Sequence, residues 1–204
     1  MIAIIDYRAG NLRSVERALR HLGLECAITS DSRKILDARR VIFPGVGAAG
    51  KAMETIVSLG LDEVIRAVVE RGTPFLGICL GTQIILEESE EDGARCLGII
   101  PGAARRFPDM GLKIPHIGWN TLKHCRTHPI FEGVDAQAQF YFVHSYYPDP
   151  AGQGFAMATT SYGIEFASVI ARDNVVATQF HPEKSGRPGL RMLQNFSFWD
   201  GCPG

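Results

Sequence analysis

One cysteine, with a glycine two residues before it and another two residues after it, constrains this chain more than any other feature. An apolar run from Phe75 to Ile78 predicts a buried strand, and a helical segment is expected to follow from about Leu80 to Glu88. Cys79 lies at the junction, between Gly77 and Gly81. This is the spacing of the G-x-S-x-G nucleophile elbow with sulfur in place of oxygen, and it predicts a nucleophile held at the top of a sheet.

The two glycines have a physical reason in such an elbow. A side chain at Gly77 or Gly81 would collide with the neighbouring element, because the turn from strand to helix is tight. The sulfur would also lie at a helix N-terminus, where backbone N–H groups and the helix dipole favour the thiolate. The alternative is that Cys79 is a small core residue, as free cysteines usually are.

Strands and helices alternate in the first half of the chain. The predicted strands are Ile2–Asp6, Glu25–Thr29 and Val41–Phe43, which Pro44 is expected to end. A helix with apolar residues at helical spacing begins at Leu12, with Asn11 as a plausible N-cap and Gly23 as its stop. A helix pair broken near Gly60 follows. Such alternation predicts a parallel sheet covered on both faces.

From Cys96 onward, short strands and turns dominate. The acidic run that precedes this part, residues 87–92, is expected to close the helix after the elbow. The predicted strands are Leu97–Ile100, Ile114–Trp119, Phe140–Tyr146, Phe166–Ala171 and Val175–Phe180, with a hairpin turn at Asp173-Asn174 and a last helix near Pro188–Trp199. These strands are expected to extend the sheet antiparallel at one edge. The predicted fold class is therefore α/β, with a mixed, mostly parallel sheet flanked by helices.

Composition excludes several kinds of protein. A chain of 204 residues with 46% hydrophobic content fits one domain, residues 1–204, with a sizeable core. A net charge of −1 provides no basic face for nucleic acid. The longest uncharged stretch, residues 72–86, is too short to span a bilayer. Five cysteines without a C-x-x-C motif favour reduced thiols, and hence a cytoplasmic location.

A glycine-rich loop, residues 45–51, resembles two phosphate-binding motifs without completing either. A P-loop needs Ser or Thr after Lys51, where this chain has Ala52, and a dinucleotide motif needs an acid at the end of the next strand, where this chain has Cys79. We therefore interpret the segment as a loop whose bare backbone must approach something closely, so that a side chain at Gly47 would obstruct it. A plain connecting loop is the alternative.

A histidine follows the last predicted strand, at the sheet edge toward which the elbow points. Glu183 is close enough in sequence to bond one imidazole nitrogen of His181, which would leave the other nitrogen to accept the Cys79 proton. The alternative is a loop histidine beside a surface glutamate. His124, Cys125 and His128 have a loosely metal-like spacing without a second ligand pair, and His116 is interpreted as a structural histidine.

Taken together, these motifs resemble the class I (triad) glutamine amidotransferases. The resemblance rests on Gly77-Ile-Cys79-Leu-Gly81-x-Gln83 and Gln179-Phe-His181-Pro-Glu183. Further motifs resemble the glutaminase subunits of imidazole glycerol phosphate synthase, from histidine biosynthesis: Ile5-Asp-Tyr-x-x-Gly10-Asn11-Leu, Pro44-Gly-Val-Gly47, Pro115-His-x-Gly118-Trp-Asn120 and Tyr141-Phe-Val-His-Ser-Tyr146. The likeness extends from Met1 to about Phe198.

The resemblance implies a role for each matching position. Cys79 would attack the side-chain amide of glutamine, His181 would transfer protons and Glu183 would orient His181. It further implies an oxyanion hole formed by Val46, Gly47 and Leu80. The implied glutamine site consists of Gly45, Gln83, Glu91, His144, Ser145 and Tyr146. The implied partner interface consists of Asn11, Trp119, Tyr141 and Lys184. The implied partner is a (βα)₈-barrel cyclase in a heterodimer. No metal, nucleotide or flavin cofactor is implied.

Two other functions use the same residues. The first is a cysteine hydrolase or peptidase on this scaffold, against which the Pro115–Asn120 motif speaks. The second is a non-enzymatic regulatory homologue, against which an intact Cys79, His181 and Glu183 speak. Turnover of peptides would support the first, and an unreactive Cys79 would support the second.

Overall fold

A mixed sheet of eight strands forms the centre of the protein. The computed structural model describes residues 1–124, 126–152 and 154–202. The strand order is β2-β1-β3-β4-β14-β13-β12-β9. Five strands run parallel, β1 (Ile2–Ile5), β2 (Cys26–Thr29), β3 (Arg40–Gly45), β4 (Phe75–Cys79) and β14 (Val175–Thr178). Three antiparallel strands extend one edge, β13 (Ile164–Arg172), β12 (Ala156–Tyr162) and β9 (Lys123–His124), which confirms the predicted mixed sheet.

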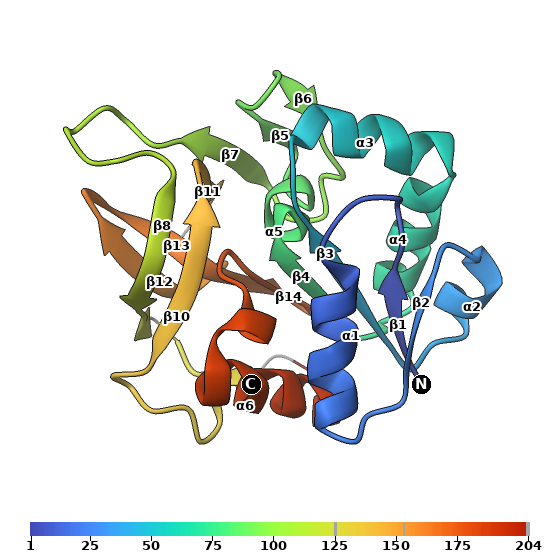
Figure 1. Ribbon diagram of the computed structural model, residues 1–204. Coiled ribbons are helices and arrows are strands. Elements are labelled where there is room, and N and C mark those ends of the chain that lie inside the picture. The colour runs from blue at the N-terminus through green and yellow to red at the C-terminus, as the bar shows by residue number, and fades with distance from the viewer. Residues whose placement is uncertain (125, 153, 203–204) are drawn as a thin grey trace.

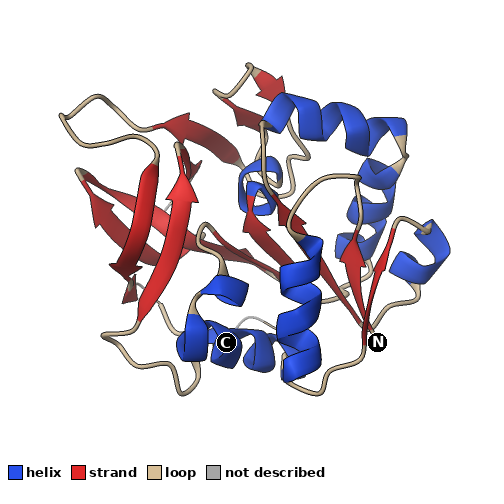
Figure 2. Ribbon diagram, viewed as in Figure 1, coloured by secondary structure: helices blue, strands red, loops and turns tan. Residues whose placement is uncertain are grey.

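Helices cover both faces of this sheet (Figures 1 and 2). On one face lie α1 (Leu12–His21) and α6 (Gly186–Phe198), and on the other lie α3 (Ala49–Ser58) and α4 (Leu61–Glu70). The remaining helical segments are short: α2 (Ser32–Leu36), α5 (Leu80–Ile84) and the 3₁₀ turns η1 (Pro129–Phe131) and η2 (Pro182–Lys184). No helix in the described part of the chain has the length and apolar character needed to cross a membrane.

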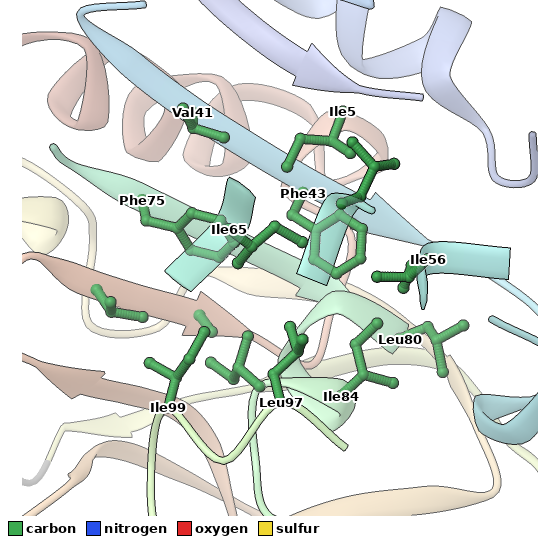
Figure 3. Close-up of a cluster of buried hydrophobic side chains, with 14 of the residues drawn as sticks. Ile5, Val41, Phe43, Ile56, Ile65, Phe75, Leu80, Ile84, Leu97 and Ile99 are labelled. Atoms are coloured by element: carbon green, nitrogen blue, oxygen red, sulfur yellow. The ribbon is translucent and has the colours of Figure 1, made fainter. Parts of the chain in front are cut away.

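Strand β1 shows why its sequence is apolar at every position. Successive side chains of a strand point to opposite faces, and here both faces are covered. Ile4 packs into the cluster that contains Leu19 of α1, whereas Ile5 packs into the opposite cluster with Ile56 of α3 and Ile65 of α4 (Figure 3). The buried core therefore lies in two layers, one on each side of the parallel strands.

Two smaller sheets are not hydrogen-bonded to the main sheet, contrary to the predicted topology. Within the described part of the chain, β8 (His116–Thr121) and β10 (Gln139–His144) pair only with each other. A four-stranded sheet is formed by β7 (Gly102–Arg106), β11 (Tyr146–Pro150), β5 (Glu88–Ser89) and β6 (Ala94–Arg95). The predicted strand Phe140–Tyr146 is divided, because the chain turns at Ser145 from β10 into β11. The predicted edge extension is thus wrong for β8 and β10.

The segment after the elbow also differs from the prediction. α5 ends at Ile84 rather than near Glu88, and the acidic run forms β5 and a turn. The segment 97–100 is not a strand. Its backbone N–H groups donate instead to free carbonyl groups at the end of α5. The Leu97 N–H donates to the Ile84 carbonyl (2.9 Å), and the Ile99 N–H donates to the Ile85 carbonyl (2.8 Å).

Two residues that were predicted to mark element boundaries, Pro44 and Asn11, act differently in the structure. β3 continues through Pro44 to Gly45, because pairing with β1 ends at Ile42 and leaves Pro44 with β4 as its one neighbouring strand. Asn11 stands at the N-cap position of α1, but its side chain makes no capping bond to the helix backbone and accepts from the Ser14 hydroxyl instead (2.9 Å). The predicted break at Gly60, with a left-handed φ of 66°, is confirmed.

Candidate active site

Cys79 lies on a strained turn between β4 and α5. Its φ and ψ are 55° and −106°, a region that costs a non-glycine residue free energy. A Cβ on Gly77 would lie 3.0 Å from the Ala177 Cβ on β14, and a Cβ on Gly81 would overlap the Phe43 carbonyl oxygen on β3. The predicted collision at both glycines is therefore confirmed, and the nucleophile elbow is present.

His181 and Glu183 form a buried pair next to this turn. The His181 Nδ1 lies 2.8 Å from the Glu183 Oε1, and their side chains are 2% and 1% exposed. Burial alone would lower the pKa of His181, but Cys79 and Glu183 outweigh it and raise that pKa to about 9. Among the described residues, the His181 Nε2 has no hydrogen-bond partner. His181 is therefore basic enough to hold the thiol proton on its second nitrogen at neutral pH.

Gln179 is a residue of this site to which the sequence analysis assigned no role. It is fully buried, and its Nε2 lies 3.7 Å from the Cys79 sulfur. Its Oε1 accepts from the Gln83 Nε2 at 3.0 Å. Gln179 belongs to the same motif as His181, and a polar residue directly after a buried strand was the signal that could have identified it.

Most of the predicted site residues line one cavity of about 400 Å³. Its wall contains Val46, Gly47, Cys79, Leu80, Gln83, Glu91, Pro115, Val143, His144, Ser145, Tyr146, His181 and Lys184. Gly45 and Glu183 lie outside this wall. A larger hollow of about 800 Å³ near Trp119 and the start of α6 is lined by neither a cysteine nor a histidine, so the predicted chemistry belongs to the smaller cavity.

The glycine loop lies directly against the start of α5. A Cβ on Gly45 would lie 2.8 Å from the Leu80 Cβ and 2.9 Å from the Tyr7 hydroxyl, so only bare backbone fits there. At Gly47 no heavy atom of the described protein lies within 4 Å of the place a Cβ would take, so the expected obstruction concerns a bound ligand and stays a prediction. The glycine at position 47 is required by its φ of +100°, which side chains rarely allow.

Three polar side chains on the cavity wall already have partners. The Glu91 Oε2 accepts from the Ala49 N–H at the start of α3 (2.7 Å), and burial raises the pKa of Glu91 although this bond opposes the shift. The Gln83 Nε2 donates to the Tyr146 carbonyl (2.9 Å). The His144 ring uses both nitrogens within the protein, so neither of them is free to bind a ligand.

The residues expected at a partner interface gather beside the cavity, on β8, β10 and η2. Trp119 is 54% exposed, and its ring lies 5.9 Å from that of Tyr141. The Lys184 Nζ lies 6.0 Å from the centroid of the Tyr141 ring, at the limit of a cation–π contact. The fourth residue, Asn11, lies at the start of α1.

The loosely metal-like spacing around His124 falls partly outside the described residues, since it includes Cys125. The described histidines have other contacts: the His128 Nδ1 accepts from the Ile130 N–H (3.1 Å), and the His124 ring packs on Phe131. Within residues 1–124, 126–152 and 154–202, no three His, Cys, Asp or Glu side chains come together as a metal site.

Comparison with known proteins places this geometry in a family. The family model for class-I glutamine amidotransferases matches residues 3–199. Imidazole glycerol phosphate synthase subunit HisH from Desulfovibrio desulfuricans is 53% identical over 205 residues, covering 96% of this chain and 93% of that protein. The HisH subunit from Dehalococcoides mccartyi is 50% identical over 197 residues, covering 96% of each.

Solved structures share the fold at lower identity. A glutamine amidotransferase crystal structure aligns with a TM-score of 0.72 at 21% identity, covering 96% of this chain and 98% of that one. PurLQS from Thermotoga maritima aligns with a TM-score of 0.76 at 19% identity, covering 96% of each chain. The fold, the family match and the HisH relatives agree. This chain belongs to the class-I glutamine amidotransferases and, among them, to the HisH subunits of imidazole glycerol phosphate synthase.

Proposed function

We propose that this chain hydrolyses glutamine through a thioester on Cys79 and passes the ammonia to a cyclase partner in histidine biosynthesis. The observation that carries the proposal is a cysteine on a strained elbow, inside a cavity that also contains the open nitrogen of the His181–Glu183 pair. A nucleophile, a base and a group that orients the base are the parts that acyl transfer needs.

Each proposed step uses groups that meet in the cavity. His181 first takes the proton of the Cys79 thiol, as its pKa of about 9 favours, and the sulfur anion then attacks the amide carbon of glutamine. His181 then protonates the leaving nitrogen, the C–N bond breaks, and ammonia leaves a thioester on Cys79. Water, deprotonated by His181, attacks this thioester and releases glutamate. Glu183 holds His181 through Nδ1 during each of these proton transfers.

Backbone groups would stabilise the oxyanion of each tetrahedral intermediate. Leu80 is the first residue of α5, so its N–H has no partner within the helix. Val46 and Gly47 line the same cavity, and we propose that an N–H of this loop is the second donor. A carboxylate at Glu91 suits the α-ammonium of glutamine. Gln83, Ser145 and Tyr146 complete the proposed glutamine site on the cavity wall, together with Gly45 at the start of the glycine-rich loop.

A partner that receives the ammonia follows from its chemistry. Free ammonia becomes mostly ammonium at neutral pH and loses its nucleophilicity. We propose that residues 1–204 are a single glutaminase domain and that the partner is a (βα)₈-barrel cyclase in a heterodimer. Trp119, Tyr141, Lys184 and Asn11 would form the interface. Because the reaction needs a reduced Cys79 thiol, we propose a cytoplasmic location.

Release of glutamate by the purified complex tests this function. Glutamine should be hydrolysed slowly by the chain alone, as the family resemblance implies, and faster when the barrel partner holds its own substrate. The same preparation should leave unstructured peptides intact. Absence of glutamate release in the presence of the partner, or turnover of peptides instead of glutamine, would contradict the proposal.

A further inference from the structure

Two buried histidines, of which one, His144, lines the cavity, have no part in the acyl-transfer steps. His116 begins β8 and His144 ends β10, and the two residues are opposite each other in the antiparallel register. They are 3% and 5% exposed. The His116 Nδ1 lies 3.0 Å from the His144 Nε2, and the His144 Nδ1 lies 2.8 Å from the Tyr146 carbonyl oxygen.

The partners of this pair determine where the protons lie. A carbonyl oxygen only accepts, so the proton of neutral His144 must be on Nδ1, where it is donated to Tyr146. The bare Nε2 of His144 then accepts from the Nδ1–H of His116. The bare Nε2 of His116 in turn faces the Asn120 amide nitrogen at 3.5 Å, a long contact with a group that donates. The chain of donors therefore runs in one direction, from Asn120 to Tyr146.

The surroundings of both rings hold them neutral and in place. Burial lowers the pKa of His116 to about 4 and that of His144 to about 3. The His116 ring is stacked between Tyr162 and Phe142, with ring centroids 4.0 and 4.9 Å away and interplanar angles of 24° and 25°. At neutral pH each ring thus carries one proton, and His116 cannot turn without breaking two stacked contacts.

The chain of donors ends on the corner where β10 turns into β11. The Tyr146 carbonyl accepts from His144 and also from the Gln83 Nε2 at 2.9 Å, so both of its lone pairs are used. The neighbouring Ser145 carbonyl accepts from the Phe107 N–H at 3.1 Å. Ser145 and Tyr146 form part of the cavity wall, and their peptide groups are therefore fixed relative to Cys79.

We infer that His116 is a positioning residue for glutamine, which acts through His144 to hold the Ser145–Tyr146 corner in its binding orientation. The inference rests on the proposed function, because it assigns the corner to the glutamine site. It also gives His116 a role beyond packing. If His116 contributed only packing, it would not matter to substrate affinity which ring nitrogen carries the proton.

The proton positions can be read directly in the wild-type protein. Long-range ¹H–¹⁵N spectra of uniformly labelled chain at pH 7 distinguish the two neutral forms of each ring. Both His116 and His144 should carry the proton on Nδ1. A proton on the Nε2 of His144, or a doubly protonated ring at pH 7, would overturn the inference. This measurement needs no variant, so it does not depend on how a substituted chain folds.

A matched pair of substitutions tests the effect on glutamine. The amide nitrogen of His116→Asn takes the place of Nδ1 and can donate to His144, whereas His116→Leu fills the space without a donor. With the cyclase partner present, His116→Leu should raise KM for glutamine about tenfold with kcat within about twofold, as expected when binding alone is weakened. His116→Asn should keep KM within about threefold of wild type, because the donor is retained.

Two controls separate this inference from the proposed function. Synthesis from added ammonium salt by the His116→Leu complex should equal that of wild type, which shows that the variant folds and assembles. If His116→Leu keeps the wild-type KM, or if His116→Asn is impaired as much as His116→Leu, the positioning role is wrong. If the wild-type complex itself releases no glutamate, the proposed function fails instead.

Discussion

At the scale of single residues, Cys79 is distinguished by its backbone more than by its surroundings. A φ of 55° at a non-glycine residue is costly, and the packing of β3, β4 and β14 around the elbow maintains it. The sulfur is thereby aimed into the cavity, where His181 is the nearby base.

The reactivity of the cysteines should follow these environments. Iodoacetamide in limiting amount at pH 7 should alkylate Cys79 before Cys26 and Cys96, because burial raises the pKa of Cys26 and raises that of Cys96 to about 11. Peptide mapping gives the order, with the exposed Cys202 as the reference for an ordinary thiol. Labelling of Cys79 no faster than Cys96 would refute the assignment of the nucleophile.

The roles within the triad predict unequal losses. His181→Ala removes the group that moves both protons, so kcat should fall by about 10²–10⁴. Glu183→Gln keeps a hydrogen-bond partner for His181 but removes the charge that raises its pKa, so its loss should be smaller. Steady-state glutaminase kinetics of the two variants decide the point. A larger loss for Glu183→Gln would mean that the roles are misassigned.

Residue types and short spacings were sufficient to predict the triad candidates. Cys79, His181 and Glu183 stood in local motifs whose chemistry does not depend on distant contacts. Val143 and Tyr7 could not be assigned in the same way. Each reaches the site through tertiary packing: Tyr7, for example, is 1% exposed beneath the glycine loop and lies beside the place a Gly45 Cβ would take.

At the scale of elements, the elbow depends on close approach between β3, β4 and α5. Gly81→Ala would place a methyl group into the Phe43 carbonyl, so the variant should fold poorly or lose much of its Tm. The added methyl group of Gly47→Ala would meet open space, so the variant should lose only about 1–2 kcal/mol of stability, which is what a positive φ costs a residue with a side chain. If relief of this φ turns the loop N–H away from the oxyanion, kcat should fall on the order of 10²–10³.

Measuring Tm and kcat together separates these two glycines. The expected pattern is a large stability loss for Gly81→Ala, and a folded Gly47→Ala with low kcat. A folded Gly47→Ala with wild-type kcat would remove the glycine loop from the mechanism. A wild-type Tm for Gly81→Ala would contradict the packing of the elbow.

The parallel half of the sheet could be predicted from sequence because its strands are short apolar runs separated by helices. The second half could not. β8 and β10 alternate in burial, which suits an edge of the main sheet as well as a separate ribbon. Their placement is decided by aromatic packing, such as Phe142 against Phe166, between segments distant in the chain. The segment 97–100 was misassigned because its backbone N–H groups bond to carbonyls at the end of α5 rather than to a neighbouring strand.

At the scale of the whole molecule, the buried histidines predict how stability depends on pH. Burial lowers the pKa of His116 and His128 to about 4 and that of His144 to about 3, from the usual 6.5. Below pH 6.5 the unfolded chain therefore binds more protons than the folded one, and stability falls as the pH falls toward 5. His181 acts oppositely: its pKa of about 9 adds stability that is present below pH 6.5 and lost as the pH rises through 9.

Thermal unfolding across pH 5–10 should therefore show a Tm maximum near neutral pH. His181→Gln should flatten the alkaline side, and His116→Asn should reduce the slope of the acid side. A Tm that rises steadily to pH 9, or an acid side unchanged in His116→Asn, would show that these histidines do not titrate as their burial requires.

In the proposed function, Cys79 is the residue that releases ammonia for a second protein. The most direct measurement is product formation by the complex with its barrel partner, from glutamine and from ammonium salt at high pH, for wild type and Cys79→Ala. The substitution removes the nucleophile and leaves Trp119, Tyr141 and Lys184 in place. We predict that the variant complex assembles, forms product from ammonium salt at the wild-type rate and forms none from glutamine. Product from glutamine at the wild-type rate in Cys79→Ala, or no advantage of glutamine over ammonia for the wild-type complex, would contradict the account.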